Sequence, residues 1–452
     1  MKTEKTITGN VDLDVLSYTV GDDPVLDRDL VVWDCLGTAA HVTMLSKMPV
    51  TPPVVTKEEA AQVKSELAKV IESAQKGEFT IEESDQDVHM AVERRLTETL
   101  GSLGKKIHTG RSRNDQVAVD VRLHIKDQIL STISEITDLA TSLVEFGKKY
   151  DRIPLVGRTH LQPAMPSSVG VWASGHAEMI LDQVANMEAA YKLNDACPLG
   201  SAAGYGVPLP LDRKRTSSLL GFERPLHNVF GASMARGEDE AALLSALAQL
   251  MAHLSRIAQD VIVFSMPEFG YFTLPRQYCT GSSIMPQKYN PDVMELVRSK
   301  TAIVLGLATA SLSMLHAMPG GYNRDLQDSK GLYMKGLSIT RTTLRIMAKF
   351  IDGMGIDEAK LREGFTPGVF ATDVALRKVA GGMPWREAYH AVRDNLEALS
   401  SEDPDVAVAA KTHEGATAGL DWNLYGSRID DIRNSAQERR DQFNKKMEEL
   451  LG

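Results

Sequence analysis

The sequence predicts an all-α protein whose largest part is a bundle of long helices. Apolar residues recur at steps of three and four over several segments of about twenty-five residues or more. Strand-like alternation is scarce, and no internal repeat or low-complexity tract occurs. Helices of this length are about twice the usual mean. They bury their apolar faces most readily against one another, in a bundle with coiled-coil-like packing.

The lengths of the helical patterns and the positions of helix breakers divide the chain into three parts. Residues 1–110 contain shorter helical patterns around the breaker MPVTPP, and residues 362–452 contain short segments interrupted by GFTPG, GGMP and SEDPD. Residues 111–361 hold the long segments, at about 116–146, 168–193, 243–261, 291–315 and 330–354. We therefore predict an N-terminal helical domain, a central long-helix bundle domain and a small C-terminal helical domain.

Composition and charge narrow the functional classes. The chain is 43% hydrophobic and 24% charged, which is typical of a soluble protein with a large core. Its net charge is −10 and it has no basic block, so we expect no nucleic-acid partner. An anionic substrate would need local positive charge. Three cysteines without metal-like spacing, no signal-like N-terminus and no long apolar run predict a cytoplasmic protein without a membrane span.

The first polar cluster, GKKIHTGRSRNDQVAVD at residues 104–120, precedes a long helical segment. One interpretation is structural: Asn114 or Asp115 caps the helix, and the basic residues form a solvated loop. The other is functional, because a helix N-terminus flanked by Arg111 and Arg113 can bind an anion. Spacing alone leaves both interpretations open.

The second polar cluster, GRTHLQPAMPSS at residues 157–168, also precedes a long segment. Thr159 and His160 are adjacent in it, and two prolines stiffen the loop. A lone histidine is more often a structural hydrogen-bonding group than a catalyst. His160 gains a catalytic interpretation only if another cluster supplies a carboxylate to orient it.

The third polar cluster is GSSIMPQKYNPDVME at residues 281–295. Structurally, Asn290 would be an N-cap, and Pro291 would occupy the first helical position. Chemically, the amides of a glycine–serine loop and a helix start can surround a carboxylate, with Lys288 as the counter-charge. The cluster therefore combines the groups that carboxylate recognition requires.

These motifs resemble those of a known enzyme superfamily. GSSIMPQKYNP resembles the GSSxMPxKxN motif of the fumarase/aspartase superfamily, and HTGRSRNDQVAVD is similar to the matching segment of argininosuccinate lyases. DLVVWDCLGTAAHVTML, SDQDVHMAVERRL, GYNRDLQDSK and FATDVALRKVAGGMPWREAYHAV extend the similarity over nearly the whole chain. The resemblance implies a three-domain fumarase/aspartase-like fold. It also implies a homotetramer with a twenty-helix core and active sites shared between three subunits.

The resemblance also implies roles for individual residues. Ser282 would be the catalytic base, and His160 would pair with Glu295. Lys288 and Asn290 would hold the succinyl carboxylate. The other residues implied to lie near the substrate are Ser283, Arg113, Asn114, Thr159, Asp87, His89, Tyr322, Gln327 and Lys330. No metal and no organic cofactor is expected, because the sequence contains no metal-ligand spacing, P-loop or dinucleotide fingerprint.

The implied reaction removes a proton next to a carboxylate, passes through an aci-carboxylate and expels an amine as fumarate forms. We expect argininosuccinate as substrate, with a role in arginine biosynthesis. The sequence departs from most argininosuccinate lyases at Arg158, Pro163 and Met165 and lacks their usual N-terminal motif. Two alternatives therefore stay open: a lyase for another N-substituted aspartate, and a catalytically silent, crystallin-like structural protein. The identity of the general acid also stays open.

Overall fold

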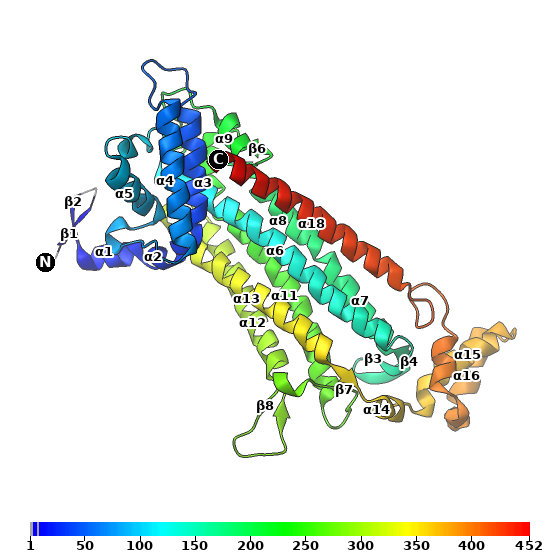
Figure 1. Ribbon diagram of the computed structural model, residues 1–452. Helices are drawn as coiled ribbons and strands as arrows, with labels where there is room; N and C mark the ends of the chain where they lie inside the picture. The colour runs from blue at the N-terminus through cyan, green and yellow to red at the C-terminus, as the bar shows by residue number, and fades with distance from the viewer. Residues whose placement is uncertain (1–2, 7–8) are drawn as a thin grey trace.

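The computed structural model describes residues 3–6 and 9–452 and is an elongated, almost entirely helical molecule (Figure 1). Long helices run side by side along its length, N-terminal helices gather at one end, and short helices lie at the other end. The predicted all-α class with a long central bundle is confirmed.

The bundle consists of helices close to the predicted segments, except for the last helix, α18, which was not predicted. They are α6 (Arg113–Lys149), α7 (Val169–Asp182), α8 (Val184–Asn194), α11 (Glu238–Ser265), α12 (Asp292–Leu315), α13 (Ser329–Gly353) and α18 (Trp422–Leu451). The segment predicted at 168–193 is two helices rather than one. At Gln183 the amide bonds to the carbonyl of Ile180, three residues back, which ends α7 in a tight turn before α8 begins.

The N-terminal end contains a hairpin and shorter helices. They are β1 (Thr3–Thr6), β2 (Gly9–Asp12), α1 (Leu13–Val20), α2 (Asp23–Leu26), α3 (Val31–Leu45), α4 (Lys57–Gln75) and α5 (Val88–Leu100). A 3-10 turn, Asp27–Leu30, joins α2 to α3. The helices α14 (Glu358–Glu363), α15 (Ala371–Ala380), α16 (Trp385–Arg393) and α17 (Pro404–Ala409) follow the bundle, and α9 (Arg213–Leu219) and α10 (Val229–Met234) connect α8 to α11.

Strands in the described residues form only two-stranded pairs. The antiparallel pairs are β1–β2, β3–β4 (Pro154–Thr159 and Gln162–Ser168), β8–β9 (Thr280–Gly281 and Tyr289–Asn290) and β7–β10 (Phe272–Thr273 and Gly355–Ile356). The parallel pair is β5–β6 (Ala196–Cys197 and Arg224–Pro225). In β3–β4, Pro154 pairs with Ser168 and Thr159 with Gln162, so the hairpin turns at His160 and Leu161.

One hydrophobic core runs through the bundle and the N-terminal helices. α6 packs on α3, α7, α13 and α18, and α11 packs on α12 and α13. Two glycines allow close helix contact. A Cβ at Gly336 of α13 would lie 2.5 Å from the Leu244 side chain, and one at Gly147 of α6 would lie 2.4 Å from the Trp422 ring. Larger residues at these positions would force the helices apart.

The helices of the C-terminal region pack against two different hydrophobic clusters. Ala375, Ala388, Val392 and Leu399 form a small cluster apart from the main core, whereas α18 returns along α6 and joins that core. The division of the chain at residues 110 and 361 stays a prediction. Because α18 packs on α6, residues 422–451 belong to the main core rather than to the small C-terminal cluster.

Helix α11 is long and apolar enough to cross a membrane by length and composition alone. Two thirds of its most apolar window is buried inside the protein (67%), and it lies in the middle of the bundle. Burial in the core accounts for its apolar character.

Candidate active site

Seven of the predicted site residues come together in one pocket of about 220 Å³ at the N-terminal end of α6. They arrive from three separate parts of the chain, which the fold brings to one place. These residues are Asp87, His89, Arg113, Asn114, Tyr322, Gln327 and Lys330.

The start of α6 positions Arg113 and Asn114 in the pocket wall. Ser112, rather than Asn114 or Asp115, is the N-cap: its hydroxyl accepts the Asn114 amide, and the Asp115 carboxylate accepts the Ser112 amide at 2.8 Å. The second carboxylate oxygen of Asp115 accepts the amides of Gly200 and Ala202, both at 2.9 Å. Asn114 is thereby free of capping, and its buried Oδ1 has no hydrogen-bond partner among the described residues.

Ion pairs hold the charged side chains of the pocket. Arg113 donates from Nε to Asp87 Oδ2 at 2.6 Å, and Asp87 in turn caps α5 by accepting the Met90 amide. Lys330, at the start of α13, contacts Asp27 and lies 2.8 Å from Asp23 Oδ1. Burial raises the pKa of Asp23, and Lys330 partly offsets that rise. Two carboxylates therefore share one ammonium at this wall.

Several lining residues were not predicted from the sequence: Asp23, Asp27, Ser112, Val117, Arg236 and Arg324. Arg236 stacks on the Tyr322 ring at 5.3 Å, and Arg324 donates to Gln327 Oε1 at 2.9 Å. One signal was available for the acids. Asp27 lies between Leu26 and the apolar run that begins at Leu30, and an acid that becomes buried there commonly has a charged partner.

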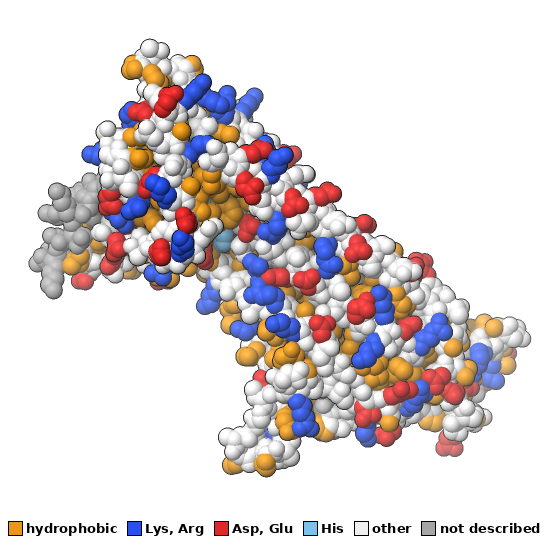
Figure 2. All heavy atoms as spheres, in the orientation of Figure 1, with side chains coloured by type: hydrophobic (Ala, Val, Ile, Leu, Met, Phe, Trp, Pro, Cys, Tyr) orange, Lys and Arg blue, Asp and Glu red, His pale blue; other side chains and the backbone are white. Residues whose placement is uncertain are grey.

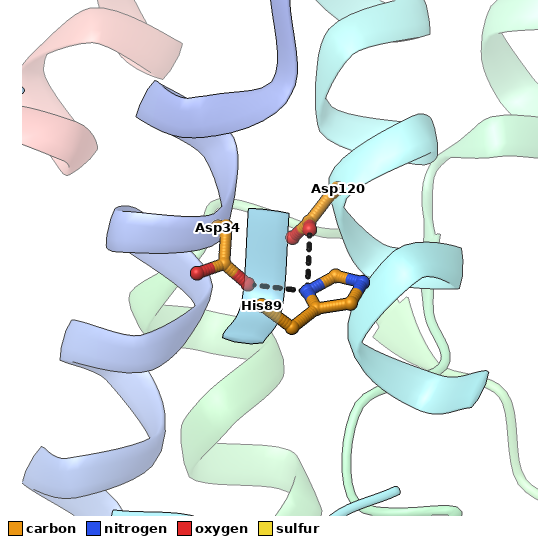
Figure 3. Close-up of side chains that lie close together, drawn as sticks. All are labelled: Asp34, His89 and Asp120. Carbon is orange, nitrogen blue, oxygen red and sulfur yellow. Dashed lines mark hydrogen bonds and ion pairs between the residues drawn. The ribbon is translucent and has the colours of Figure 1, made fainter. Parts of the chain in front are cut away.

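His89 is held from behind the pocket by two further acids (Figure 3). Its Nδ1 lies 2.7 Å from Asp34 Oδ1 and 3.5 Å from Asp120 Oδ2. The donor atoms of these three residues lie within 4.8 Å of one another, close enough to hold one metal ion. Asp34 and Asp120 each interrupt an apolar run, VVWDCLG and VAVDVRL, which is the sequence signal that identifies them.

The second cluster lies at the far end of α6, in the β3–β4 hairpin. Thr159 and His160 are exposed at its tip, and His160 and Leu161 both have positive φ, at 53° and 61°. Non-glycine residues in this conformation store strain and are concentrated at functional sites. The Arg158 guanidinium stacks on the Phe269 ring at 4.8 Å and donates to the Leu161 carbonyl at 3.1 Å, which fixes the tip.

The third cluster lies in the loop between β8 and β9, which projects from the bundle (Figure 1). Ser282 is half-buried, and its Oγ accepts the amides of Ile284 and Met285 at 3.3 and 3.0 Å. Ser283 and Lys288 are exposed. The loop presents the hydroxyl in a polarised state, because two backbone N–H groups donate to it.

The start of α12 differs from the prediction. α12 begins at Asp292, with Pro291 in the N-cap position, and no side chain caps the helix. Asn290 instead belongs to β9 and donates to the Thr280 hydroxyl at 3.4 Å. Pairing between β8 and β9 fixes the backbone of Asn290 and prevents it from acting as the cap. Glu295 lies in the first turn of α12 with an exposed side chain.

The three clusters do not meet within one chain. α6 has 37 residues, so about 55 Å of helix separates the pocket from the hairpin. α12 has 24 residues, so about 36 Å separates the loop from Tyr322. His160 and Glu295 are both exposed, and in the described part of one chain no hydrogen bond or ion pair joins them. Their pairing stays a prediction.

Comparisons with known proteins identify the family. The lyase family profile matches residues 31–306. The chain is 39% identical to the argininosuccinate lyase of Sorangium cellulosum, covering 93% of this chain and 97% of that protein. It is 40% identical to the argininosuccinate lyase of Parabacteroides distasonis, covering 91% of each.

Solved structures support the same fold. An EDDS lyase variant with bound fumarate has a TM-score of 0.75 at 24% identity, covering 96% of this chain and 92% of that one. A class II fumarase from Schistosoma mansoni has a TM-score of 0.71 at 16% identity, covering 91% of this chain and 100% of that one. At these identities the two structures show the fold alone, and the sequence relatives show an enzyme of the carbon–nitrogen lyase class. The chain belongs to the argininosuccinate lyase family of the fumarase/aspartase superfamily.

Proposed function

We propose that the protein eliminates arginine from argininosuccinate and releases fumarate, without a metal or organic cofactor. The observation that carries this proposal is the identity of about two residues in five with argininosuccinate lyases over nearly the full length of both chains. Arginine biosynthesis is the corresponding cellular role, and we expect it in the cytoplasm.

The chemistry of the pocket suits the arginine half of this substrate. Asp23 and Asp27 offer carboxylates beside a single ammonium, and such a wall can accept an ammonium or guanidinium group. Arg236 and Arg324 line the same pocket and can bind a carboxylate. A pocket with both kinds of group fits an amino acid, which carries both charges.

The loop cluster suits proton abstraction. A free serine hydroxyl is a weak base, and the amides of Ile284 and Met285 would stabilise the Ser282 alkoxide. Lys288 and Asn290 would bind the carboxylate as negative charge develops on it. The amides come from residues two and three positions after the serine.

A homotetramer would bring the three clusters together. α12 exposes Leu296, Ile303 and Leu312, at 54%, 44% and 53%, on a helix that is otherwise part of the bundle. Hydrophobic side chains show among the charged ones on the face over α12 and α13 (Figure 2). Exposed apolar helix faces of this kind are typical of subunit interfaces. In such an assembly His160 of one subunit can reach Glu295 of another.

The alternative is a lyase for another N-substituted aspartate. The β3–β4 hairpin supports this alternative, because Arg158 lies directly beside Thr159 and lines a groove together with the C-terminal helices. Fumarate formation, followed by absorbance, separates the two. We expect kcat/KM for argininosuccinate to exceed that for N-alkyl aspartates without an amino-acid end by about tenfold or more, the loss that an unpaired buried polar site produces. Equal or higher values for the simpler amines would refute arginine as the leaving group.

A further inference from the structure

Three buried side chains connect the pocket to the interior of the protein: Asp34 on α3, His89 on α5 and Asp120 on α6 (Figure 3). They are 2%, 5% and 0% exposed, respectively. The Nδ1 of His89 faces both carboxylates, and Figure 3 shows the other ring nitrogen directed away from them. His89 also lines the pocket. Its ring therefore lies between the buried acids and the cavity.

The carboxylates are incompletely satisfied in the described structure. Asp34 Oδ2 and both carboxylate oxygens of Asp120 have no hydrogen-bond partner. An ionised carboxylate without partners is costly in the interior, so a proton or a cation must compensate it. Among the described residues, only His89 lies within ion-pair distance of both acids.

The charged groups in and around Asp34, His89 and Asp120 (the trio) include more carboxylates than permanent cations. Arg111 lowers and Asp27 raises the pKa of Asp120, and Arg113 binds Asp87 from the pocket side. The carboxylates Asp27 and Asp87 and the cations Arg111 and Lys330 act on these three residues, while Asp23 shares Lys330 and Arg113 pairs with Asp87. Among the described residues, His108, Tyr333 and Cys35 are further titratable groups beside them. The acids of the trio add to the three outer carboxylates, so protons are needed to balance the charge.

Both expected proton positions lie within the trio. Burial alone would lower the pKa of His89, but Asp87, Asp34 and Asp27 together outweigh burial and raise it above its ordinary value. Burial raises the pKa of Asp120 well above its ordinary value, and the negative charges of Asp34 and Asp27 add to the rise. An imidazolium at His89 and a neutral carboxyl at Asp120 satisfy the local charge balance.

We propose that Asp34 is a positioning residue that keeps His89 as an imidazolium beside the neutral carboxyl of Asp120, and that the Nε2–H of His89 donates a hydrogen bond to the substrate in the pocket. The inference rests on the proposed function, which supplies the occupant of the pocket. Asp34 accepts the Nδ1 proton and fixes the ring orientation, as a carboxylate does for a functional histidine. The acceptor on the substrate is an anionic oxygen, because an imidazolium binds a carboxylate more strongly than a neutral group.

A divalent cation shared by the three residues is the alternative occupant. The 2.7 Å contact between Nδ1 and Asp34 is the length of a hydrogen bond to a charged group, which favours a proton there. Arg111 and Lys330 add positive charge beside Asp120 and oppose a second cation. The experiment includes this alternative as an outcome.

The test uses Asp34→Asn, His89→Gln and the double variant in the full-length protein. Loss of the carboxylate lowers the pKa of His89 by about 1–3 units. The pH above which KM for argininosuccinate rises should therefore move down by the same amount in Asp34→Asn, while kcat changes less. His89→Gln should remove that pH dependence. If Asp34 acts through His89, the double variant has the KM of His89→Gln within about twofold.

The matched control is Asp260→Asn, which removes a carboxylate 3.2 Å from the ring of His176 on another part of the bundle. It should leave the pH profile of KM unchanged. Multiplicative losses in the Asp34→Asn/His89→Gln double variant, or an unshifted profile in Asp34→Asn, would refute the proposal. If Asp34→Asn does not fold, a ¹⁵N NMR titration of His89 in the wild type replaces it, and a ring that is neutral at pH 7.5 would refute the proposal.

Two further measurements keep the outcomes distinct. Wild-type protein that does not release fumarate from argininosuccinate refutes the proposed function. In that case a ¹⁵N NMR titration of His89 in ligand-free protein decides the charge state by itself: an imidazolium at pH 7.5 supports the inference, and a neutral ring overturns it. Thermal stabilisation of the wild type by added Mn²⁺ or Zn²⁺ that is lost in Asp120→Asn would assign the trio to a metal and also overturn it.

Discussion

Two variants that are inactive alone should regain activity when they assemble together. Ser282→Ala alters the loop before α12, and Arg113→Met alters the pocket that also contains Tyr322. About 36 Å of helix separates the loop from that pocket in one chain. The two altered groups can serve the same substrate only if different subunits supply them.

The expected recovery follows from counting subunits. When equal amounts of the two variants assemble at random, half of the pockets and half of the loops are intact. A site that takes its pocket from one subunit and its loop from another then has both intact in about a quarter of cases. Mixed tetramers should therefore have about a quarter of the wild-type turnover, whereas each parent has almost none.

The assay is co-expression of differently tagged variants, purification through both tags and measurement of fumarate release. The control mixture combines Ser282→Ala with Lys288→Met, which alter the same loop and leave no site with an intact loop. Recovery in this control, or none in the first mixture, would refute the assignment of pocket and loop to different subunits.

Three further outcomes are expected. Ser282→Ala should keep its assembly and lose about 10²–10⁴-fold in turnover, the range for a positioned base, while Ser283→Ala loses much less. Initial rates of fumarate release measure this, and the reverse order would mean that Ser283 is the base. Lys330→Met should destabilise the protein by about 3–5 kcal/mol in denaturant unfolding, because it leaves the buried Asp27 and the half-buried Asp23 without their shared cation. Adding Asp27→Asn should restore part of that loss, and no restoration would exclude the pair as the cause. Burial lowers the pKa of His124 to about 4. The contribution of the neutral ring to the free energy of unfolding is therefore complete above pH 6.5 and declines by up to about 3 kcal/mol as the pH falls to 4. Unfolding midpoints that decline equally in His124→Gln would contradict this.

The long helices could be predicted from the sequence because apolar spacing depends only on neighbouring turns. The boundaries were less accessible. Ser112 rather than Asn114 caps α6, because its hydroxyl accepts the Asn114 amide while the Asp115 carboxylate accepts the Ser112 amide. Pro291 favoured a cap at Asn290, but pairing of β8 with β9 determined the backbone there. Contacts that are distant in sequence overrode the local signals at that position.

The pocket could be predicted only in part. Residues within recognisable motifs, such as Arg113 and Lys330, were named in advance and line it. Asp23 and Arg236 were missed because each lies in a segment without periodic or motif signal. Arg324 was missed although it lies within the GYNRDLQDSK motif, because no role was assigned to it there. Asp34 and Asp120 were visible as isolated acids in apolar runs, a pattern that indicates burial but not the partner.

The 37-residue length of α6 has a consequence for how the sequence can vary. The helix carries the pocket at one end and leads into the β3–β4 hairpin at the other, so its length determines the distance between these two clusters of site residues. Deletion of one residue from its middle would shorten it by about 1.5 Å and rotate the hairpin by about 100°. In the proposed tetramer that rotation would direct Thr159 and His160 away from the neighbouring site. Outside the pocket and Gly147, conservative substitutions in α6 are therefore tolerable where insertions and deletions are not. Changes in length should be confined to loops such as 201–212.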